Sequence, residues 1–171
     1  MTLAEFNTLP SDRAASALMD CCGSARWAAT VASRRPYAEV EALHKAADAI
    51  WWKLDRAEWL EAFSHHPQIG EAPASGSDSA RQWAEGEQRG ARAGTEEVKA
   101  RLDRANRAYF NKFGYIYIVC ATGKSAAGML AILEQRLQND LPSELSIAAE
   151  QQRLITRVRL NKLLAGEQPS L

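Results

Sequence analysis

Apolar residues recur at intervals of three and four positions along most of this chain, which is the spacing typical of amphipathic helices. The clearest run begins at Val40 and ends at Leu54, and a second begins at Thr95 and ends before Gly114. Shorter runs predict a small helix after Thr2 and further helices over residues 11–22, 25–35, 56–64, 80–89, 129–137 and 143–164. We therefore predict an all-α fold, a single-domain helical bundle of about eight or more helices.

Capping residues mark several of these helix boundaries. Thr2 with Glu5, and Asp55 with Glu58, have the spacing of a capping box, in which each side chain accepts a backbone N–H of the other residue. Gly23 has the position of a left-handed residue that ends a helix. The Gly, Ser and Pro content of residues 71–79 predicts a mobile surface loop.

Residues 115–120 form the one stretch that is enriched over several positions in β-branched and aromatic side chains. The stretch is too short for a typical helix, so we predict one short buried extended segment at 115–120. The Gly-Lys-Ser that follows resembles the end of a phosphate-binding loop, but such a loop needs a further glycine where this chain has Ile118. The spacing therefore argues against nucleotide binding.

The composition limits the classes of partner. A length of 171 residues suits one compact domain, which we take to be 1–171. Lys plus Arg and Asp plus Glu both number 21, so we expect no nucleic-acid partner and no membrane partner. No apolar run approaches the roughly 20 residues of a spanning helix, and we expect a soluble, unexported protein. Cys21, Cys22 and Cys120 match neither zinc nor disulfide spacing, which predicts reduced structural thiols.

Titratable side chains gather at residues 61–71, where Pro67 disfavours helical geometry at His66. His65, His66 and Glu71 are close enough along the chain to share the mouth of a pocket. Metal binding is the weaker interpretation, because adjacent histidines project in different directions and no His-x-x-x-His spacing is present. A helix-capping histidine beside a solvated one stays an open alternative at this point.

An arginine lies at the edge of the apolar face of the last predicted helix. Arg159 should therefore be partly buried and should require a carboxylate from the protein or from a ligand. On helix geometry, an internal salt bridge with Glu87 is as good an explanation as a ligand contact, and Glu87 is equally consistent with solvated surface. His44 falls on an otherwise polar face, so we assign it no chemistry. The apolar face is defined by Ile147, Leu154, Ile155 and Val158.

Four motifs along the chain carry a resemblance to a known family. They are Phe-Ser-His-His-Pro-Gln-Ile-Gly-Glu at 63–71, Gly-Glu-Gln at 86–88, the run at 111–125 and Arg-Leu-Asn-Lys-Leu-Leu at 159–164. Taken together, these motifs resemble the family of 2-oxo-4-hydroxy-4-carboxy-5-ureidoimidazoline (OHCU) decarboxylase. The resemblance implies an all-α fold, usually dimeric, that acts in urate breakdown and converts OHCU to (S)-allantoin with loss of carbon dioxide. It also implies a carboxy-lyase without metal or organic cofactor, with a small-molecule ureide as substrate.

The resemblance implies roles for individual residues. The family's catalytic histidine precedes a proline, which indicates His66 and not His65, with Pro67 fixing its approach. The glutamate that grips the ring and ureido nitrogens matches Glu87, because a carboxylate accepts paired N–H donors. The C-terminal arginine that contacts substrate matches Arg159.

The extended segment would add backbone contacts to substrate around Ile118 and Val119. Many members of the family carry a serine three residues before the glutamate, where this chain has Ala84. Two alternatives remain: a catalytically inactive helical ligand-binding or scaffold protein of the same fold, which Ala84 favours, and a cyclic-amide hydrolase. The final Gln-Pro-Ser-Leu is not a Ser-Lys-Leu-type peroxisomal signal, so we expect a cytoplasmic protein. The resemblance implies that this protein is a homodimer.

Overall fold

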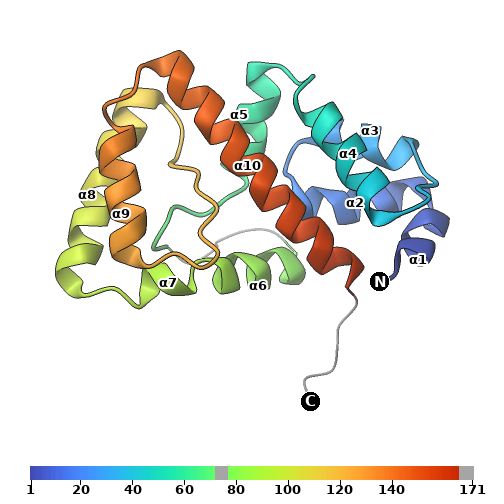
Figure 1. Cartoon of the computed structure of the whole chain (residues 1–171), viewed down its shortest axis with the longest axis horizontal. Helices are drawn as coiled ribbons and strands as arrows, with labels where there is room; N and C mark the ends of the chain where they lie inside the picture. Colours follow the sequence, from blue (N-terminus) through green and yellow to red (C-terminus); the bar gives the residue numbers. More distant parts are fainter. Residues whose placement is uncertain (72–76, 166–171) are drawn as a thin grey trace. The chain divides into compact units, whose positions relative to one another are not determined.

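The fold was obtained as a computed structural model that describes residues 1–71 and 77–165. These residues contain helices and no β-strand, which confirms the all-α prediction (Figure 1). Part of the predicted loop (72–76) and the C-terminal residues from 166 onward lie outside the described residues. The ten helices of the described residues are α1 (Leu3–Thr8), α2 (Ser11–Cys21), α3 (Ala25–Ser33), α4 (Val40–Trp51), α5 (Arg56–Ser64), α6 (Asp78–Glu87), α7 (Arg89–Arg92), α8 (Glu96–Phe113), α9 (Ala126–Arg136) and α10 (Leu141–Leu164).

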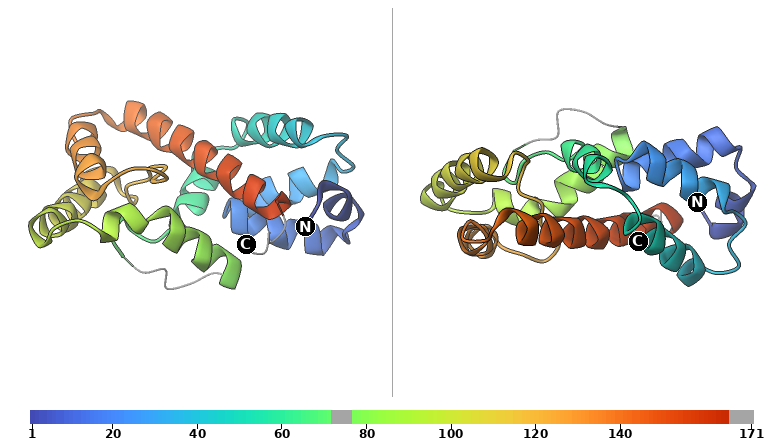
Figure 2. Two further views of the ribbon diagram at one scale, coloured as in Figure 1. Left: turned by 60° about the horizontal axis from the view of Figure 1, so that its bottom comes forward. Right: turned by 90° about the horizontal axis from the view of Figure 1, so that it is seen from above.

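The chain divides into two compact units, which we describe separately. The first unit comprises residues 1–62 and the chain from residue 153 onward, and the second comprises residues 63–152. In the first unit α2 packs on α3 and α3 on α4. Figure 2 shows α2 and α3 in two further views. Trp27 is fully buried there, and its Nε1 donates to the carbonyl of Ala47 at 3.0 Å. Burial of this large side chain is a main source of stability in such a small core.

The second unit is built around α8 and α9, which lie side by side in Figure 1. Its core contains an aromatic cluster centred on Tyr109, whose ring centroid lies 4.6 Å from that of Phe113 and 5.5 Å from that of Tyr117. Residues 115–121 connect the two helices without joining a helix or strand, and Ile118 and Val119 in this segment are 2% and 4% exposed. The predicted buried segment is therefore present.

The helix caps that were predicted from residues a few positions apart were confirmed. Thr2 and Glu5 form both bonds of a capping box, with backbone-to-side-chain distances of 2.7 and 3.2 Å. Asp55 and Glu58 do the same at 2.8 and 3.0 Å. Gly114 ends α8 with a φ of 80°, a left-handed conformation that glycine adopts without strain.

Two expectations about local structure were wrong. Gly23 is not left-handed, because α2 ends at Cys21 and the extended Cys22 leads directly to the Ser24 cap of α3. His44 is not on a polar face: it is 4% exposed, and its Nε2 lies 2.8 Å from Asn161 Oδ1. This histidine is buried against a partner on α10, which is far away in the sequence. The periodicity of α4 does not reveal such a partner.

The buried face of α10 also differs from the predicted one. Of the four residues assigned to its apolar arc only Ile155 is buried, and Ile147 is 37% exposed. The buried face includes the polar side chains of Gln152, Thr156 and Arg159, so hydrophobicity does not mark it. Arg159, which was predicted to be partly buried, is 5% exposed and therefore more deeply buried than predicted.

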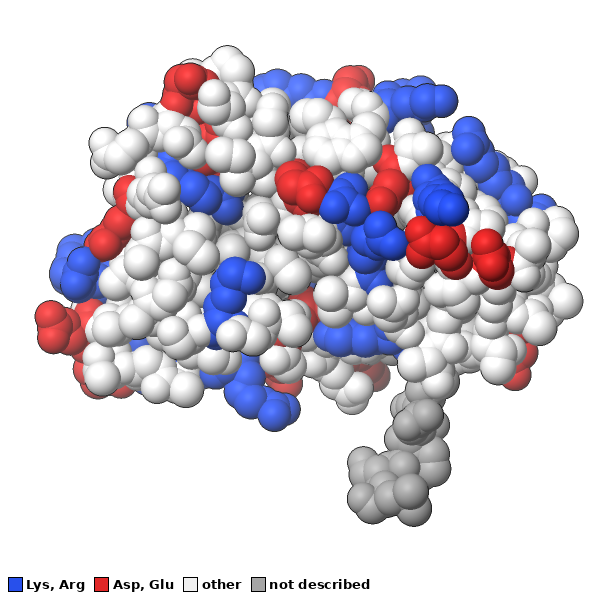
Figure 3. All heavy atoms as spheres, in the orientation of Figure 1, with Lys and Arg blue, Asp and Glu red and all other residues white. Residues whose placement is uncertain are grey.

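Charges of both signs share the surface. Basic and acidic side chains are interspersed over the face that Figure 3 shows, consistent with the equal totals of the sequence. In the first unit Asp48 bonds both Arg153, at 2.8 Å, and Arg157, at 3.2 Å. Within residues 1–71 and 77–165, no helix is long and apolar enough to cross a bilayer.

Candidate active site

The stretch that holds the predicted catalytic histidine leaves α5 as expected. The helix ends at Ser64, and His66 N donates to the carbonyl of Phe63 at 3.1 Å in the turn that follows. His66 is half-buried whereas His65 is exposed. Pro67 prevents helix continuation here, so His66 lies where a helix stops. The structure thus confirms the predicted boundary and shows that the two histidines differ in exposure.

Gln88 joins this stretch to the end of α6. It caps α6 directly after Glu87 and is 5% exposed. Its Oε1 accepts the backbone N–H of Gly70 at 2.9 Å, and its Nε2 donates to the carbonyl of Pro67 at 3.5 Å. The structure therefore brings the segment after His66 next to the helix end that carries Glu87. No sequence pattern indicates this role, because a glutamine beside a predicted glutamate has no distinctive spacing.

A second amide side chain, from a helix later in the sequence, also bonds the stretch after His66. Asn106 on α8 is 5% exposed, and its Nδ2 donates to the carbonyl of Ile69 at 3.0 Å. Gly70 turns the chain with a φ of 100°, and the next amide, that of Glu71, donates to Gln68 O at 3.0 Å. Buried amide side chains thus supply partners to a backbone that has no helix or strand to supply them.

Glu87 is half-buried and is the last residue of α6. Ala84, one turn earlier, is 4% exposed, so its methyl group packs inside the protein. The carbonyl of Ala84 accepts the Gln88 N–H at 3.0 Å, which makes this turn continuous with the Gln88 cap. Ala84 therefore lies on the same short helix end as Glu87, and a side chain there has contact with protein and not with bulk solvent.

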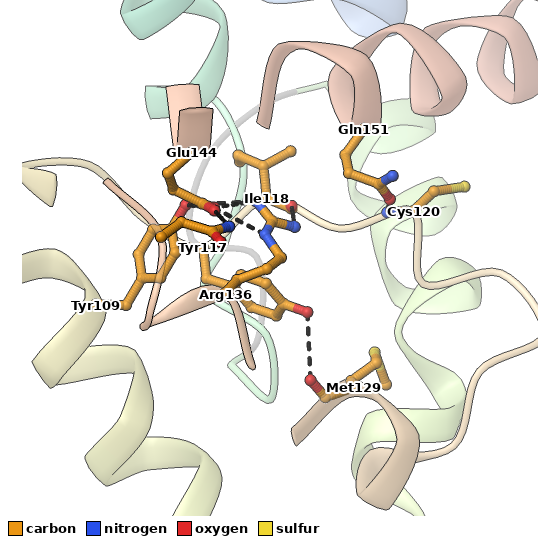
Figure 4. A network of polar contacts seen from close by, with 9 residues as sticks. Tyr109, Tyr117, Ile118, Cys120, Met129, Arg136, Glu144 and Gln151 are labelled. Carbon is orange, nitrogen blue, oxygen red and sulfur yellow. Dashed lines mark hydrogen bonds and ion pairs between the residues drawn. The ribbon is translucent and has the colours of Figure 1, made fainter. Parts of the chain in front are cut away.

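The predicted backbone contacts lie in the buried segment between α8 and α9. The carbonyl of Ile118 accepts a hydrogen bond from Arg136 Nη1 at 2.7 Å, and Cys120 N donates to Gln151 Oε1 at 3.0 Å (Figure 4). Tyr117 Oη donates to the carbonyl of Met129 at 3.2 Å. Side chains thus fix both polar edges of this segment.

Arg136 belongs to a buried ionic network. Its Nε and Nη2 donate to Glu144 Oε1 at 2.8 and 2.5 Å, and the two side chains are 7% and 0% exposed. Tyr109 Oη also donates to Glu144. Burial and this bond raise the pKa of Tyr109 far above its ordinary value. Burial opposes the charged form of Arg136, but the hydrogen bond and charge of Glu144 outweigh it and raise the pKa of Arg136. Arg136 is therefore charged and Tyr109 neutral at neutral pH.

A pocket of about 460 Å³ lies in the second unit beside the stretch that follows Pro67. Its lining includes Ile69 and Leu102, with Arg92, Lys99 and Asp103 contributing charges of both signs. None of the residues assigned to substrate by the resemblance lines this pocket. We therefore do not equate it with the predicted site.

Arg159 lies in the first unit, on α10, whereas the other predicted site residues lie in the second unit. Its Nη1 donates to the carbonyl of Asp20 at 3.2 Å. Cys22 is buried nearby, and burial raises the pKa of its thiol to about 12, against a smaller lowering effect of the Arg159 charge. Among residues 1–71 and 77–165, no group of three or more His, Cys, Asp or Glu side chains is placed to hold a metal ion.

Known proteins match this chain over most of its length. A family model described as OHCU decarboxylase matches residues 7–161. The uric acid degradation bifunctional protein TTL of Arabidopsis thaliana is 37% identical over 149 residues, which cover 86% of this chain and 46% of that protein. The 2-oxo-4-hydroxy-4-carboxy-5-ureidoimidazoline decarboxylase of Mus musculus is 28% identical over 144 residues, 84% of this chain and 81% of that protein.

A solved structure is similar as well. The crystal structure of OHCU decarboxylase in the presence of (S)-allantoin superposes with a TM-score of 0.76 at 36% identity, and the match covers 88% of this chain and 98% of that one. The chain spans less than half the length of the bifunctional relatives from Arabidopsis thaliana and Bacillus subtilis, at 46% and 33%.

Proposed function

Because this chain belongs to the OHCU decarboxylase family, we propose that it converts OHCU to (S)-allantoin and carbon dioxide in urate degradation. The family match over residues 7–161 carries this proposal, since it includes every residue assigned to the site. The uric acid degradation relatives and the structural likeness to an OHCU decarboxylase support it. The proposed enzyme is a carboxy-lyase that uses no cofactor.

The substrate's own bonds explain why side chains suffice. When the bond from the ring carbon to the carboxylate breaks, carbon dioxide leaves and the electron pair is delocalised into the adjacent C=N group of the imidazoline. The hydroxyl then loses its proton and becomes a carbonyl, while the neighbouring carbon gains a proton. The protein must stabilise the anionic intermediate and deliver that proton to one face.

The assigned residues fit these tasks. His66 would move the proton, because an imidazole with an ordinary pKa of about 6.5 can act as either acid or base near neutrality. Glu87 would hold the ring and ureido N–H groups, and Arg159 would neutralise anionic charge. Backbone groups at Ile118 and Val119 would complete the contacts, with Pro67 fixing the approach of the histidine.

The Gln88 hydrogen bonds support the pairing of histidine and glutamate. They tie Pro67 and Gly70 to the residue that follows Glu87, so the stretch that carries the proposed acid-base group is anchored to the helix end that carries the proposed carboxylate. A catalytic group gains rate from such fixed placement, because the entropy of orientation is lost during folding and not during the reaction.

The test is turnover of freshly generated OHCU, followed as (S)-allantoin by circular dichroism. Wild-type protein should give one enantiomer, whereas the uncatalysed reaction protonates both faces and gives a racemate. His66→Ala should lower kcat by about 10²–10⁴-fold, the usual contribution of a general acid-base group. The matched control is His65→Ala at the exposed neighbour, which should keep wild-type kcat. Wild-type turnover in His66→Ala would refute the assignment of this histidine.

We also propose that residues 1–171 act as one functional domain, and that the protein is a cytoplasmic homodimer. The family model runs through both compact units, which supports a shared function. The interspersed charges and the lack of a spanning helix at 1–71 and 77–165 are compatible with a protein that binds neither nucleic acid nor membrane. Sedimentation equilibrium at several concentrations tests the dimer, and a monomer at every concentration would refute it.

A further inference from the structure

The buried segment at 115–121 is held by side chains. It has no strand or helix to satisfy its backbone, yet Ile118 and Val119 are 2% and 4% exposed. Arg136 bonds the Ile118 carbonyl at 2.7 Å, and Gln151 accepts the Cys120 N–H at 3.0 Å. Figure 4 shows Arg136 between Glu144 and the segment. The position of the segment is therefore set by a few polar contacts.

Arg136 is itself rigidly placed. The guanidinium is a planar fork, and Glu144 accepts from two of its nitrogens at 2.8 and 2.5 Å. Glu144 is fixed in turn, since its Oε2 accepts from Asn139 Nδ2 at 2.8 Å and Tyr109 donates to its Oε1. The remaining terminal nitrogen, Nη1, is the one that reaches Ile118. The ion pair thus presents a fixed cationic donor to one carbonyl.

This carbonyl and the N–H of Val119 belong to the same peptide group. The peptide bond is trans, because the described residues contain a cis bond only at Arg35–Pro36. In a trans peptide the C=O and N–H point in opposite directions, so the Val119 N–H points away from Arg136. A cationic donor on the oxygen draws electron density from the amide and makes its N–H a stronger donor.

No acceptor for the Val119 N–H is found among residues 1–71 and 77–165, although Val119 is buried. Buried N–H groups are nearly always paired, so this one is suited to a ligand oxygen. OHCU offers such oxygens in its carboxylate, hydroxyl and carbonyl groups.

We propose that Arg136 is a positioning residue that fixes and polarises the Ile118–Val119 peptide so that Val119 N–H donates to an oxygen of the anionic substrate. This rests on the function proposed above. Arg136 does not touch substrate in this arrangement, and it acts only through the peptide. Glu144 and Tyr109 serve to hold the guanidinium in place.

The test replaces the buried pair as a unit, with Arg136→Met and Glu144→Leu in one protein. Apolar side chains of similar volume often replace a buried ion pair without loss of folding, so the variant removes the donor to Ile118 and keeps the volume of the buried pair. We expect kcat for OHCU to fall about tenfold with a smaller change in KM, less than the roughly hundredfold loss on removing such a donor outright. The matched control is Arg101→Met with Glu134→Leu, an exposed pair at 2.7 Å in the same unit, which should keep wild-type kcat. Wild-type kcat in the buried variant would overturn the proposal.

A second measurement separates this proposal from the proposed function. The chain has five valines, so ¹⁵N-valine labelling gives five backbone amide signals, and Val119→Ile identifies that of Val119. In the buried variant the Val119 amide proton should move to higher field, because the polarising bond is gone, and it should not move in the surface control. If wild-type protein does not turn over OHCU, the function fails but this shift still tests the peptide. An unmoved Val119 signal would overturn the role of Arg136.

Discussion

Replacing Glu144 by glutamine removes a buried negative charge and leaves the size of the side chain unchanged. Glu144 is fully buried, and its two oxygens accept from Arg136, Tyr109 and Asn139. A glutamine has one acceptor oxygen and one NH₂ group, so the NH₂ must face a donor of Arg136 or of Asn139. The guanidinium would then be buried without an anionic partner.

Breaking a buried ion pair by removing one partner costs about 3–5 kcal/mol, and we expect Glu144→Gln near the lower end because one acceptor oxygen remains. For a protein of this size, about 3 kcal/mol corresponds to a decrease in Tm of about 6–12 °C. The assay is urea unfolding at 25 °C followed by far-UV circular dichroism, with near-UV dichroism reporting on the tyrosines around the network.

The matched control is Glu134→Gln. Glu134 pairs with Arg101 at 2.7 Å, but the two side chains are 44% and 46% exposed, so solvent screens the pair. Such surface pairs contribute about 0.2–1 kcal/mol. If Glu144→Gln and Glu134→Gln lowered the free energy of unfolding by the same small amount, the argument that burial makes the first pair critical would be refuted.

Two further predictions concern a buried thiol and two glycines. Burial raises the pKa of Cys22 from 9.0 to about 12. The unfolded chain therefore loses this proton at lower pH, and stability should fall by up to about 1.4 kcal/mol per pH unit above about pH 9. Cys22→Ala should make the slope of the urea-derived free energy against pH shallower, and an unchanged slope would contradict the assigned pKa. Gly114→Ala should cost about 1–2 kcal/mol because its φ is 80°, whereas Gly86→Ala, in helix α6 with open space around it, should gain about 0.5–1 kcal/mol. If Gly114→Ala and Gly86→Ala changed Tm in the same direction, the argument from the positive φ of Gly114 would be contradicted.

Helix positions and their ends were predictable because their causes are local. The capping boxes at Thr2 and Asp55, the cap at Thr95 and the stop at Gly114 each depend on residues within a few positions, and all four are present. The same holds for His66, since Pro67 acts on the residue directly before it. The local sequence therefore determines these four helix ends and the place of the candidate histidine at the end of α5.

The roles at the candidate site came from the family motifs in the sequence and remain proposals. Periodicity left the role of Arg159 open and placed the apolar face of α10 wrongly, because polar side chains such as Gln152 and Thr156 lie on its buried face. A count of hydrophobic positions cannot find a face that is buried through polar contacts.

Tertiary structure alone decided which distant side chains meet. Gln88 bonds Gly70 from 18 positions away, Arg136 bonds Ile118 from 18 positions away, and His44 bonds Asn161 across 117 positions. Hydrogen-bond partners at such separations leave no periodic trace, since periodicity reports the face of a single element. The sequence by itself determined the helices, and only their packing determined the side-chain contacts that hold the buried Ile118–Val119 peptide and the stretch after His66.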